Sequence, residues 1–478
     1  MRSGDPILRA FERRAECHPH APVVISSGRS ISTGELDRLA EAVSAALRER
    51  RFGEDAPVVL SSSNGPAFLA SLLALRRAGL VALLVDSSTP SMERERIARR
   101  LGAAAILECR TAWPDGPGCW RVIPILDSPS TQLPGIGVVK LTSGSSGDPV
   151  GIASSSEALL ADEEAISSSM GLRETDRFLA AIPFSHAYGL SVLALTALTR
   201  GSTLVLPEDR WPWSPLTAAR RAGATVFPTA PAYLEALLGP AEAARFPTSL
   251  RLVISAGSPL APATARRFRE TFGLPVHTLY GASECGGICC DREGSAAERG
   301  TVGTPLDGVR VRLEAHDEGT DAGVGRIVVH SPAVAASYLP EPTAGLRDGV
   351  FRSGDLGSWV GGELKLAGRN VDWIDIRGRK VNPREVEAVL CELTGVREAV
   401  VLGMRLPEDG EEIVRAVIAC DPDRLDYHEV ASWCGSRLAR HKVPRSIVLV
   451  REIPRTGRGK LDRAALLMAG SVAPPARG

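Results

Sequence analysis

The chain has 478 residues, of which 44% are hydrophobic and 23% are charged, and its 56 basic side chains equal its 56 acidic ones. This length exceeds a single compact core and predicts two or three domains. The zero net charge and the aromatic content of 5% exclude the basic or stacking surface of a dedicated nucleic-acid-binding protein.

The first two-thirds of the chain alternates amphipathic helices with short apolar strands. Apolar runs without alternation, separated by helices, are typical of parallel strands that are buried on both faces, so an α/β fold is predicted. The expected helices include Glu35–Arg50 and Pro66–Ala78. The expected strands are Pro57–Leu60, Val81–Val85, Ala104–Leu107, Phe178–Ile182, Thr203–Leu206, Thr225–Phe227, Arg251–Ser255 and His277–Tyr280.

From about Gly300 the pattern changes to short strands separated by Gly, Asp and Pro turns, which favours a small barrel or a distorted sheet. These strands are Val309–Leu313, Gly325–Val329 and Glu363–Leu366. After Arg369 about 100 residues of α+β pattern follow, enough for a small independent domain. Its expected elements are the helices Pro383–Cys391 and Tyr427–Leu438 and the strands Glu398–Leu402 and Glu412–Ala419.

The N-terminal segment and the apolar runs favour a cytoplasmic protein. Residues 1–19 contain acidic side chains and lack the apolar stretch of a secretory signal. The longest apolar patches, Leu69–Leu75 and Leu190–Leu198, are interrupted by polar residues and fall short of the roughly 18 residues of a membrane-spanning helix.

The nine cysteines are too sparse for a disulfide framework in so long a chain. Only Cys285, Cys289 and Cys290 cluster, and no histidine stands close to them in sequence. Vicinal cysteines rarely chelate one ion with tetrahedral geometry, so these three are interpreted as free thiols.

The strongest single motif follows the β-like run Gly137–Leu141. Two glycines and four hydroxyl side chains can turn backbone and side-chain donors toward a polyphosphate. The spacing of its residues matches neither the Walker phosphate loop nor the nucleophile turn of the α/β-hydrolases. Taken alone, the segment could also be a flexible Ser/Gly linker. Its residues are Thr142, Ser143, Gly144, Ser145, Ser146 and Gly147.

Four further segments combine glycine turns with reactive side chains: Pro183–Leu190, Tyr280–Glu284, Phe351–Leu356 and Pro454–Asp462. In this order and spacing, the five motifs resemble the acyl-adenylate-forming superfamily of acyl-CoA synthetases, peptide-synthetase adenylation domains and luciferases. The resemblance covers essentially the whole chain. It implies two α/β subdomains plus a small β-barrel within residues 1–368, then a mobile C-terminal domain over residues 369–470. Residues 471–478 are expected to form a disordered tail.

The resemblance also implies residues that bind ATP and Mg²⁺. Thr142–Gly147 would hold the phosphates, and the Tyr280–Gly281 segment would pack on the adenine. Glu284 would bind Mg²⁺, in keeping with the preference of this cation for oxygen ligands. Lys460 would stabilise the negative charge that develops when a carboxylate attacks the α-phosphorus. The remaining residues implied are Ser258 and Pro259 beside the adenine, Ser283 on a phosphate, Asp355 on the ribose hydroxyls and Arg369 on the ribose or a phosphate.

A second set of residues is implied for the acid and for the acceptor of the acyl group. His186 would lie near the reacting carboxylate, so His186, Glu284 and Lys460 are the predicted catalytic residues. The basic loop of Arg377, Gly378, Arg379 and Lys380 would face the acceptor in the second step. The predicted acid-binding residues are Phe184, His186, Tyr188, Gly189, Phe227, Ala256, Gly257 and Ala282.

The sequence departs from the family pattern at two positions. Val150 stands where the phosphate loop usually continues with a lysine, and Lys140 or Arg352 could compensate in part. Val371 stands at the presumed hinge, where Asp or Lys is usual, and its β-branched side chain restricts local rotation.

These features favour a ligase that makes an acyl-adenylate and passes the acyl group to coenzyme A, with an aryl or medium-sized acid weakly indicated. One alternative is a ligase that loads a separate carrier protein or an amine, or activates another oxyacid. A second alternative, motivated by Val150, is a relative that binds nucleotide or acyl groups without turnover. A monomer or a loose homodimer is expected.

Overall fold

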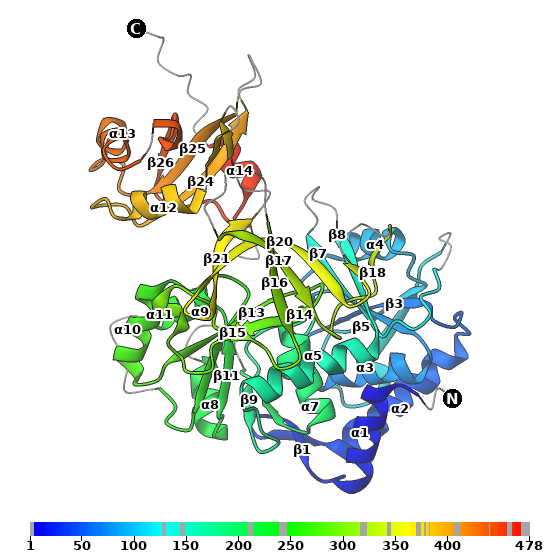
Figure 1. Cartoon of the computed structure of the whole chain (residues 1–478). Coiled ribbons are helices and arrows are strands. Elements are labelled where there is room, and N and C mark those ends of the chain that lie inside the picture. The colour runs from blue at the N-terminus through cyan, green and yellow to red at the C-terminus, as the bar shows by residue number, and fades with distance from the viewer. Residues whose placement is uncertain are drawn as a thin grey trace. The chain divides into compact units, whose positions relative to one another are not determined.

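Figure 1 shows the computed structural model of the chain. The chain divides into two compact units: Met1–Val311 with Val328–Arg352 and Val360–Lys365, and Arg312–Ile327 with Ser353–Trp359 and Leu366–Gly478. Each unit is described by itself. The structure describes residues 4–126, 131–143, 149–208, 214–238, 246–315, 323–341, 346–369, 374–376, 379–381, 383–405, 412–438, 440–456 and 461–469.

A nine-stranded sheet dominates the first unit. Strands β13, β12, β11, β9, β10 and β1 run parallel in this spatial order, and antiparallel strands cover both edges. In spatial order the strands are β15 (Thr304–Pro305), β14 (Gly286–Cys290), β13 (Val276–Ala282), β12 (Leu252–Ser255), β11 (Val226–Thr229), β9 (Arg177–Leu179), β10 (Thr203–Val205), β1 (Pro22–Ser26) and β2 (Arg29–Ser32). All residues of β11 and β12 are buried, as expected for parallel strands with helices on both faces.

A seven-stranded sheet forms the other half of this unit. Strands β7, β4, β3 and β5 are parallel neighbours, and β6, β8 and β18 add antiparallel strands at the two edges. In spatial order the strands are β18 (Ser337–Leu339), β8 (Pro149–Ser154), β7 (Val138–Ser143), β4 (Val81–Leu84), β3 (Pro57–Ser62), β5 (Ala105–Cys109) and β6 (Trp120–Pro124). Two parallel-cored sheets confirm the predicted α/β class.

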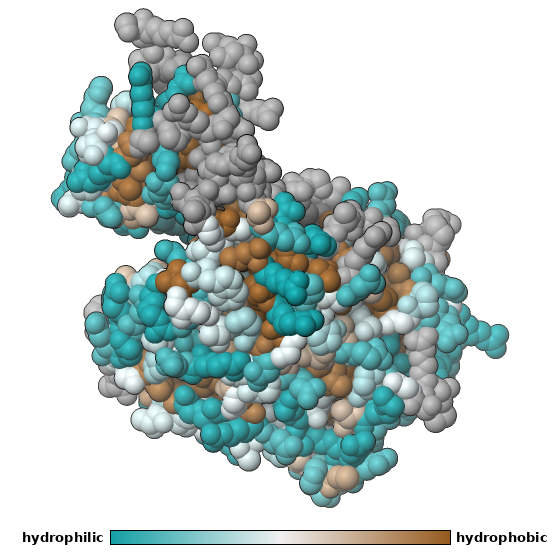
Figure 2. Space-filling model, in the orientation of Figure 1, coloured by the Kyte–Doolittle hydropathy of each residue, from teal (hydrophilic) through white to brown (hydrophobic). Residues whose placement is uncertain are grey.

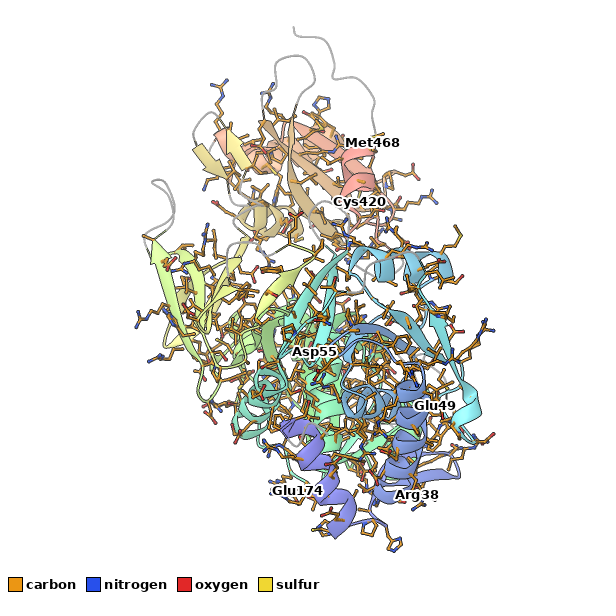
Figure 3. The ribbon with its side chains drawn as sticks, turned by 90° about the vertical axis from the view of Figure 1, so that its right-hand side faces the viewer. Arg38, Glu49, Asp55, Glu174, Cys420 and Met468 are labelled. Carbon is orange, nitrogen blue, oxygen red and sulfur yellow. The ribbon has the colours of Figure 1, made fainter. Side chains whose placement is uncertain are left out.

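Helices pack on both sheets through apolar faces. The hydrophobic α3 is almost entirely buried, whereas α2 begins with a Ser32–Glu35 capping box and exposes Arg38 and Glu49 (Figure 3). The helices of this unit are α1 (Pro6–Cys17), α2 (Thr33–Glu49), α3 (Pro66–Arg77), α4 (Ser91–Arg100), α5 (Ser156–Ser169), α6 (Ala187–Gly189), the π-helix Leu190–Leu195, α7 (Thr196–Thr199), α8 (Ser214–Ala222), α9 (Pro231–Leu237), α10 (Pro262–Phe272) and α11 (Ala296–Arg299).

A five-stranded sheet follows in sequence, in the order β16 (Arg310–Ala315), β17 (Gly325–His330), β20 (Val350–Val360) and β19 (Leu346–Arg347), with β21 (Glu363–Arg369) also paired to β20. Within the described residues this sheet is open, which corrects the closed barrel implied by the family resemblance. Closure would require the end strands to pair, but β19 is only two residues long and β16 buries none of its residues.

The C-terminal part of the second unit is an α+β domain, as predicted. Strands β24 (Glu398–Arg405), β25 (Glu412–Ala419) and β26 (Ser446–Val450) form a three-stranded sheet, and β22 (Ile374–Ile376) pairs with β23 (Arg379–Val381). The helices of this part are α12 (Pro383–Cys391), α13 (Tyr427–Gly435) and α14 (Arg463–Met468). Its apolar residues form clusters of their own that include Val386, Val414 and Val430.

The side chains that remain exposed are mostly polar on the face shown in Figure 2. The large apolar residues that are exposed include Met92 on α4, Trp359 and Val360 on β20, and Leu467 and Met468 on α14. Across the described ranges, no helix combines the length and the apolar character needed to cross a membrane. All nine cysteines are free, as expected.

Candidate active site

Two of the predicted segments lie where parallel strands of the large sheet end. Strands β11, β12 and β13 are parallel neighbours, so their carboxyl ends lie at one edge of the sheet. Ligands of open α/β sheets bind at this edge. Ala256–Pro259 follows β12, and Tyr280–Glu284 ends β13, which brings the predicted adenine and metal segments together.

The turn after β12 exposes the two residues predicted to border the adenine. Ser258 and Pro259 are exposed, and Ala256 is buried beneath them. Gly257 has a φ of +89°, in the left-handed region that favours glycine. This turn therefore presents its backbone and Ser258 at the carboxyl edge of the sheet.

The turn after β13 holds the predicted metal ligand. Tyr280, Ser283 and Glu284 are half-buried. Ala335 N donates to the backbone oxygen of Glu284 at 2.7 Å, and the Tyr338 hydroxyl donates to Glu284 Oε1 at 3.3 Å. Tyr338 lies on β18, which pairs with β8 of the other sheet, so the Glu284 carboxylate is oriented from the second sheet.

A buried charged cluster lies beside Glu284. Lys140 on β7 is only 4% exposed, and burial lowers its pKa while Asp162, Cys285 and Glu284 act to raise it. Asp162 on α5 is buried as well, and burial raises the pKa of its carboxyl above the ordinary value. Burial and the nearby carboxylates also raise the pKa of the Cys285 thiol, which disfavours the nucleophilic thiolate form.

The burial of Lys140 argues against its suggested role of compensating for Val150 at the phosphate loop. A side chain enclosed in the protein interior is poorly placed to contact phosphates directly. Arg352, the other residue suggested to compensate for Val150, is exposed on β20. Of the two, Arg352 is the better candidate for a direct phosphate contact.

The His186 segment is held by two residues that the motif analysis missed. Asn64 follows β3; its Nδ2 donates to Ile182 O at 2.7 Å, and its Oδ1 accepts from Phe184 N at 2.8 Å. Asp86 follows β4, and its Oδ2 lies 3.7 Å from His186 Nε2 and 3.4 Å from Ser185 Oγ. Asp86 directly follows a predicted parallel strand, a signal that could have identified it, whereas the sequence carries no such signal for Asn64.

The predicted acid-binding residues fall into two groups. Phe184 and Phe227 are buried and Tyr188 is half-buried: the Phe184 ring contacts Phe68, and the Tyr188 hydroxyl donates to Ile254 O at 2.9 Å. His186, Gly257 and Ala282 retain exposure. The more exposed His186, Gly257 and Ala282 thus lie at the carboxyl edge of the sheet. The aromatic residues of the first group pack in the interior behind this edge.

Several predicted motifs lie partly or wholly outside the residues that the structure describes. Strands β7 and β8 flank the predicted phosphate loop. Their last pairs before the loop are Thr142 with Val150 and Ser143 with Pro149. Asp355 belongs to the second unit, where its backbone N donates to Ser353 Oγ at 3.1 Å. Arg369 ends β21, and Arg379 and Lys380 lie on β23. Outside the described residues are Gly144, Ser145, Ser146, Gly147, Val371, Arg377, Gly378, Lys460 and residues 471–478.

The donor set suits a metal ion that arrives with a nucleotide. Among the described residues, no three His, Cys, Asp or Glu side chains are grouped to hold a metal by themselves. Glu284 supplies one half-buried carboxylate. Mg²⁺ characteristically takes one or two protein carboxylates and completes its octahedron with phosphate oxygens and water. Glu284 therefore fits nucleotide-bound Mg²⁺ better than a resident metal centre.

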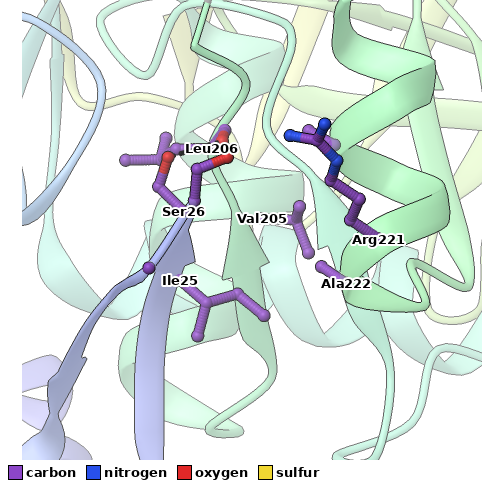
Figure 4. Close-up of a pocket in the computed structure, with 9 residues that line it drawn as sticks. Ile25, Ser26, Val205, Leu206, Arg221 and Ala222 are labelled. Atoms are coloured by element: carbon purple, nitrogen blue, oxygen red, sulfur yellow. Dashed lines mark hydrogen bonds between the residues drawn. The ribbon is translucent and has the colours of Figure 1, made fainter.

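One pocket lies apart from these residues. It has a volume of about 400 Å³ and is lined by β1, β10 and α8, with Ile25, Leu206 and Arg221 among its side chains (Figure 4). None of its lining residues belongs to the predicted motifs. It is therefore not the site formed by Glu284 and its neighbours.

Comparisons with known proteins agree with this geometry. The AMP-binding enzyme family matches residues 11–134 and 135–339, and the AMP-binding enzyme C-terminal domain matches residues 385–460. A feruloyl-CoA synthase from Amycolatopsis sp. is 30% identical over 471 residues, which cover 94% of this chain and 96% of the relative.

Two solved structures share the fold over nearly the whole chain. The amide bond synthetase McbA from Marinactinospora thermotolerans has a TM-score of 0.81 at 27% identity, covering 97% of this chain and 99% of McbA. ATP-bound MatB from Rhodopseudomonas palustris has a TM-score of 0.82 at 25% identity, covering 96% of this chain and 98% of MatB.

The matches confirm the enzyme class predicted from the motifs, an AMP-forming ligase that activates carboxylic acids. They extend over both the large region and the C-terminal domain. The chain belongs to the AMP-binding enzyme family, the acyl-adenylate-forming enzymes that its five motifs resemble.

Proposed function

We propose that this chain uses ATP and Mg²⁺ to convert a carboxylic acid to an acyl-adenylate, and then transfers the acyl group to the thiol of coenzyme A. The observation that carries the proposal is the Glu284 turn at the carboxyl end of β13. Tyr338 orients this carboxylate and ties it to β8, one of the two strands that flank the predicted phosphate loop. That arrangement suits a nucleotide whose phosphates carry a metal ion.

In the first step a carboxylate oxygen of the acid attacks the α-phosphorus of ATP. The new O–P bond forms as the bond from the α-phosphorus to the pyrophosphate oxygen breaks. Glu284 would hold the Mg²⁺, which would supply positive charge at the phosphates. The ammonium group of Lys460 would stabilise the negative charge that develops on the phosphate oxygens in the transition state.

The other nucleotide contacts follow from the positions of the motifs. Ser258 and Pro259 are exposed beside β13, so they can border an adenine that packs on half-buried Tyr280. Ser283 and the Thr142–Gly147 segment would donate to phosphates. Asp355 would accept hydrogen bonds from the ribose hydroxyls, and Arg369 would contact the ribose or a phosphate.

In the second step the acceptor attacks the acyl carbonyl carbon, and AMP leaves. Coenzyme A is the first choice, because the basic segment Arg377–Lys380 suits its phosphates and because the feruloyl-CoA synthase relative uses this acceptor class by name. That relative also supports an aryl or medium-sized acid as the substrate. The domains that act in the two steps are proposed to be residues 1–368 and 369–470.

An amine or a separate carrier protein is the alternative acceptor. The similarity to an amide bond synthetase supports the amine. So does the His186–Asp86 pair, since an imidazole oriented by a carboxylate can take a proton from an attacking amine. A relative without turnover, suggested by Val150, is the remaining alternative. A cytoplasmic location is proposed from the free cysteines, and a monomer or a loose homodimer from the family resemblance.

Pyrophosphate exchange over a panel of aryl and medium-chain acids tests the first step. We expect exchange with at least one acid, and loss of most exchange in Lys460→Ala and Glu284→Gln. Exchange that is absent with every acid, while ATP still binds, would favour the binding protein without turnover.

The acceptor is tested with the acid found in that panel. Coenzyme A, small amines and a carrier protein bearing a phosphopantetheine arm are supplied in parallel, and thioester and amide products are measured by mass spectrometry. Thioester formation with coenzyme A is the expected result. Amide product without thioester would replace coenzyme A by the amine in the proposal.

A further inference from the structure

A buried lysine interacts electrostatically with two carboxylates at the edge of the candidate active site. Lys140 interacts electrostatically with Asp162 and Glu284 while being only 4% exposed. Burying an ammonium group is costly unless an anion compensates it. Two carboxylates, one fully buried and one half-buried, therefore compete for one cation.

Strand register brings Lys140 to the side of the sheet that contacts Glu284. Lys140 is opposite Ile152 across β7 and β8, and Ile152 is opposite Tyr338 across β8 and β18. Directly opposed residues of antiparallel strands project from the same face of the sheet. Because the Tyr338 hydroxyl donates to Glu284 Oε1, the lysine and the tyrosine approach Glu284 from one face.

Asp162 is fixed where it can serve as the partner of Lys140. Its Oδ1 accepts from Gly287 N at 2.8 Å, and its Oδ2 accepts from Ser191 Oγ at 2.5 Å. A Cβ at Gly286 would lie 2.1 Å from Asp162 Oδ1, so the chain leaves this space to the carboxylate. Asp162 is thereby tied both to the strand after the Glu284 turn and to the π-helix Leu190–Leu195 after the His186 segment.

We propose that Asp162 is the counter-ion that engages Lys140 and so keeps the Glu284 carboxylate available for the Mg²⁺ of the nucleotide. Asp162 is a positioning residue in this scheme, because it acts on the metal ligand only through Lys140. Without Asp162, the lysine has Glu284 as its remaining carboxylate partner and competes with the metal for it. The inference rests on the proposed function, which assigns Mg²⁺ to Glu284.

The test compares Asp162→Asn with the double variant Lys140→Met/Asp162→Asn in the full chain. Mn²⁺ binding in the presence of α,β-methylene-ATP is followed by electron paramagnetic resonance, which needs no turnover. We expect Asp162→Asn to weaken Mn²⁺ binding at least about tenfold, because Lys140 without its counter-ion would pair with the Glu284 carboxylate that the metal needs. Removal of the lysine in the double variant should restore the affinity to within about threefold of wild type.

Two outcomes overturn the proposal. One is an unchanged affinity in Asp162→Asn. The other is an equal loss in the single and double variants, because the loss would then come from the hydrogen bonds of Asp162 and not from the charge of Lys140.

Lys140→Met alone provides a second measurement, which also serves if Asp162→Asn does not fold. This variant removes the competing cation, so its Mn²⁺ binding should not weaken. A loss of about tenfold or more in Lys140→Met overturns the proposal. Retained binding in both Lys140→Met and the double variant supports it.

Glu284→Gln separates a failure of this inference from a failure of the proposed function. If Glu284→Gln binds Mn²⁺ as wild type does, the metal assignment itself is wrong. If Glu284→Gln loses binding, the metal assignment stands, and the variants of Asp162 and Lys140 then test the inference alone.

Discussion

The hydroxyl group of Tyr338 donates to the Glu284 carboxylate, the predicted metal ligand, and a single substitution can test this contact. Tyr338→Phe removes the hydrogen bond to Glu284 Oε1 and leaves the ring in place. A hydrogen bond to a charged group contributes about 1.5–3 kcal/mol, so we expect the KM for Mg²⁺-ATP to rise about tenfold with a smaller change in kcat. Steady-state kinetics at varied Mg²⁺-ATP check this expectation.

Tyr427→Phe is the matched control, because Tyr427 is an exposed tyrosine of α13. It should leave both kinetic constants unchanged. An equal effect of the two substitutions, or a Tyr338→Phe variant with wild-type KM, would show that Tyr338 does not orient Glu284.

At the residue scale, the sequence named candidate residues but not their contacts. Glu284 and His186 stay predictions, made because they stand in motifs whose residue types suit phosphate and carboxylate chemistry. Asn64, Asp162 and Tyr338 were missed, because each acts on a residue far away in sequence. Their partners depend on strand register and on the packing of α5, which no local pattern encodes.

At the scale of elements, the attachment of α1 depends on one buried ion pair. Asp5 caps α1 through Ile7 N and Leu8 N, and its Oδ2 accepts from Arg76 Nη2 at 2.9 Å and from Ser156 Oγ at 2.7 Å. Burial acts to raise the pKa of Asp5, but the charge of Arg76 and these hydrogen bonds outweigh it, so the pKa lies below its ordinary value.

Asp5→Asn should destabilise the fold by about 3 kcal/mol at pH 7, because it leaves the Arg76 guanidinium buried without its anion while asparagine still caps the helix. The folded-state pKa of Asp5 is lowered, so its stabilisation is present above the unfolded pKa of about 4 and is lost as the pH falls through the folded pKa. Urea unfolding at several pH values should show the difference between wild type and variant shrinking toward acid.

Glu95→Gln provides the control for this element, since Glu95 pairs with Arg99 on the exposed face of α4. Its effect should stay below about 1 kcal/mol. A pH-independent loss in Asp5→Asn would mean that the charge of Asp5 is not what stabilises α1.

The buried strands could be predicted from the sequence, because a strand that is buried on both faces is a continuous run of apolar residues. Val81–Val85 and Arg251–Ser255 read as apolar runs, and β4 and β12 lie there. The expected strand Phe178–Ile182 is observed as the shorter β9, and beyond it the backbone oxygens of Ala180 and Ile182 accept from Asn64 Nδ2. Whether the third sheet closes into a barrel was not predictable from short strands and turns, since closure depends on which end strands pair, and over the described residues the structure shows an open sheet.

At the scale of the whole molecule, the proposed two-step reaction assigns different parts of the chain to different steps. Lys460 belongs to the range matched by the C-terminal domain family and is proposed to act only when the adenylate forms. Arg379 and Lys380 lie on β23 and are proposed to act only in transfer. Substitutions in the two places should therefore affect separate half-reactions.

Lys460→Ala is expected to slow pyrophosphate exchange by at least about a hundredfold, the scale of losing one preorganised transition-state contact. Transfer from a chemically prepared acyl-adenylate to coenzyme A should stay near the wild-type rate in this variant. Arg379→Ala/Lys380→Ala should show the reverse pattern, with exchange retained and transfer slowed. Rapid-quench measurement of each half-reaction distinguishes the two patterns.

Lys442→Ala is the control, because Lys442 is a lysine of the same C-terminal domain that pairs with Glu385 at 2.7 Å. It should leave both half-reactions intact. If Lys460→Ala slows both half-reactions equally, Lys460 acts on a state common to both steps, such as nucleotide binding. The proposed assignment of Lys460 to adenylate formation alone would then be wrong, even if the chain still forms the adenylate.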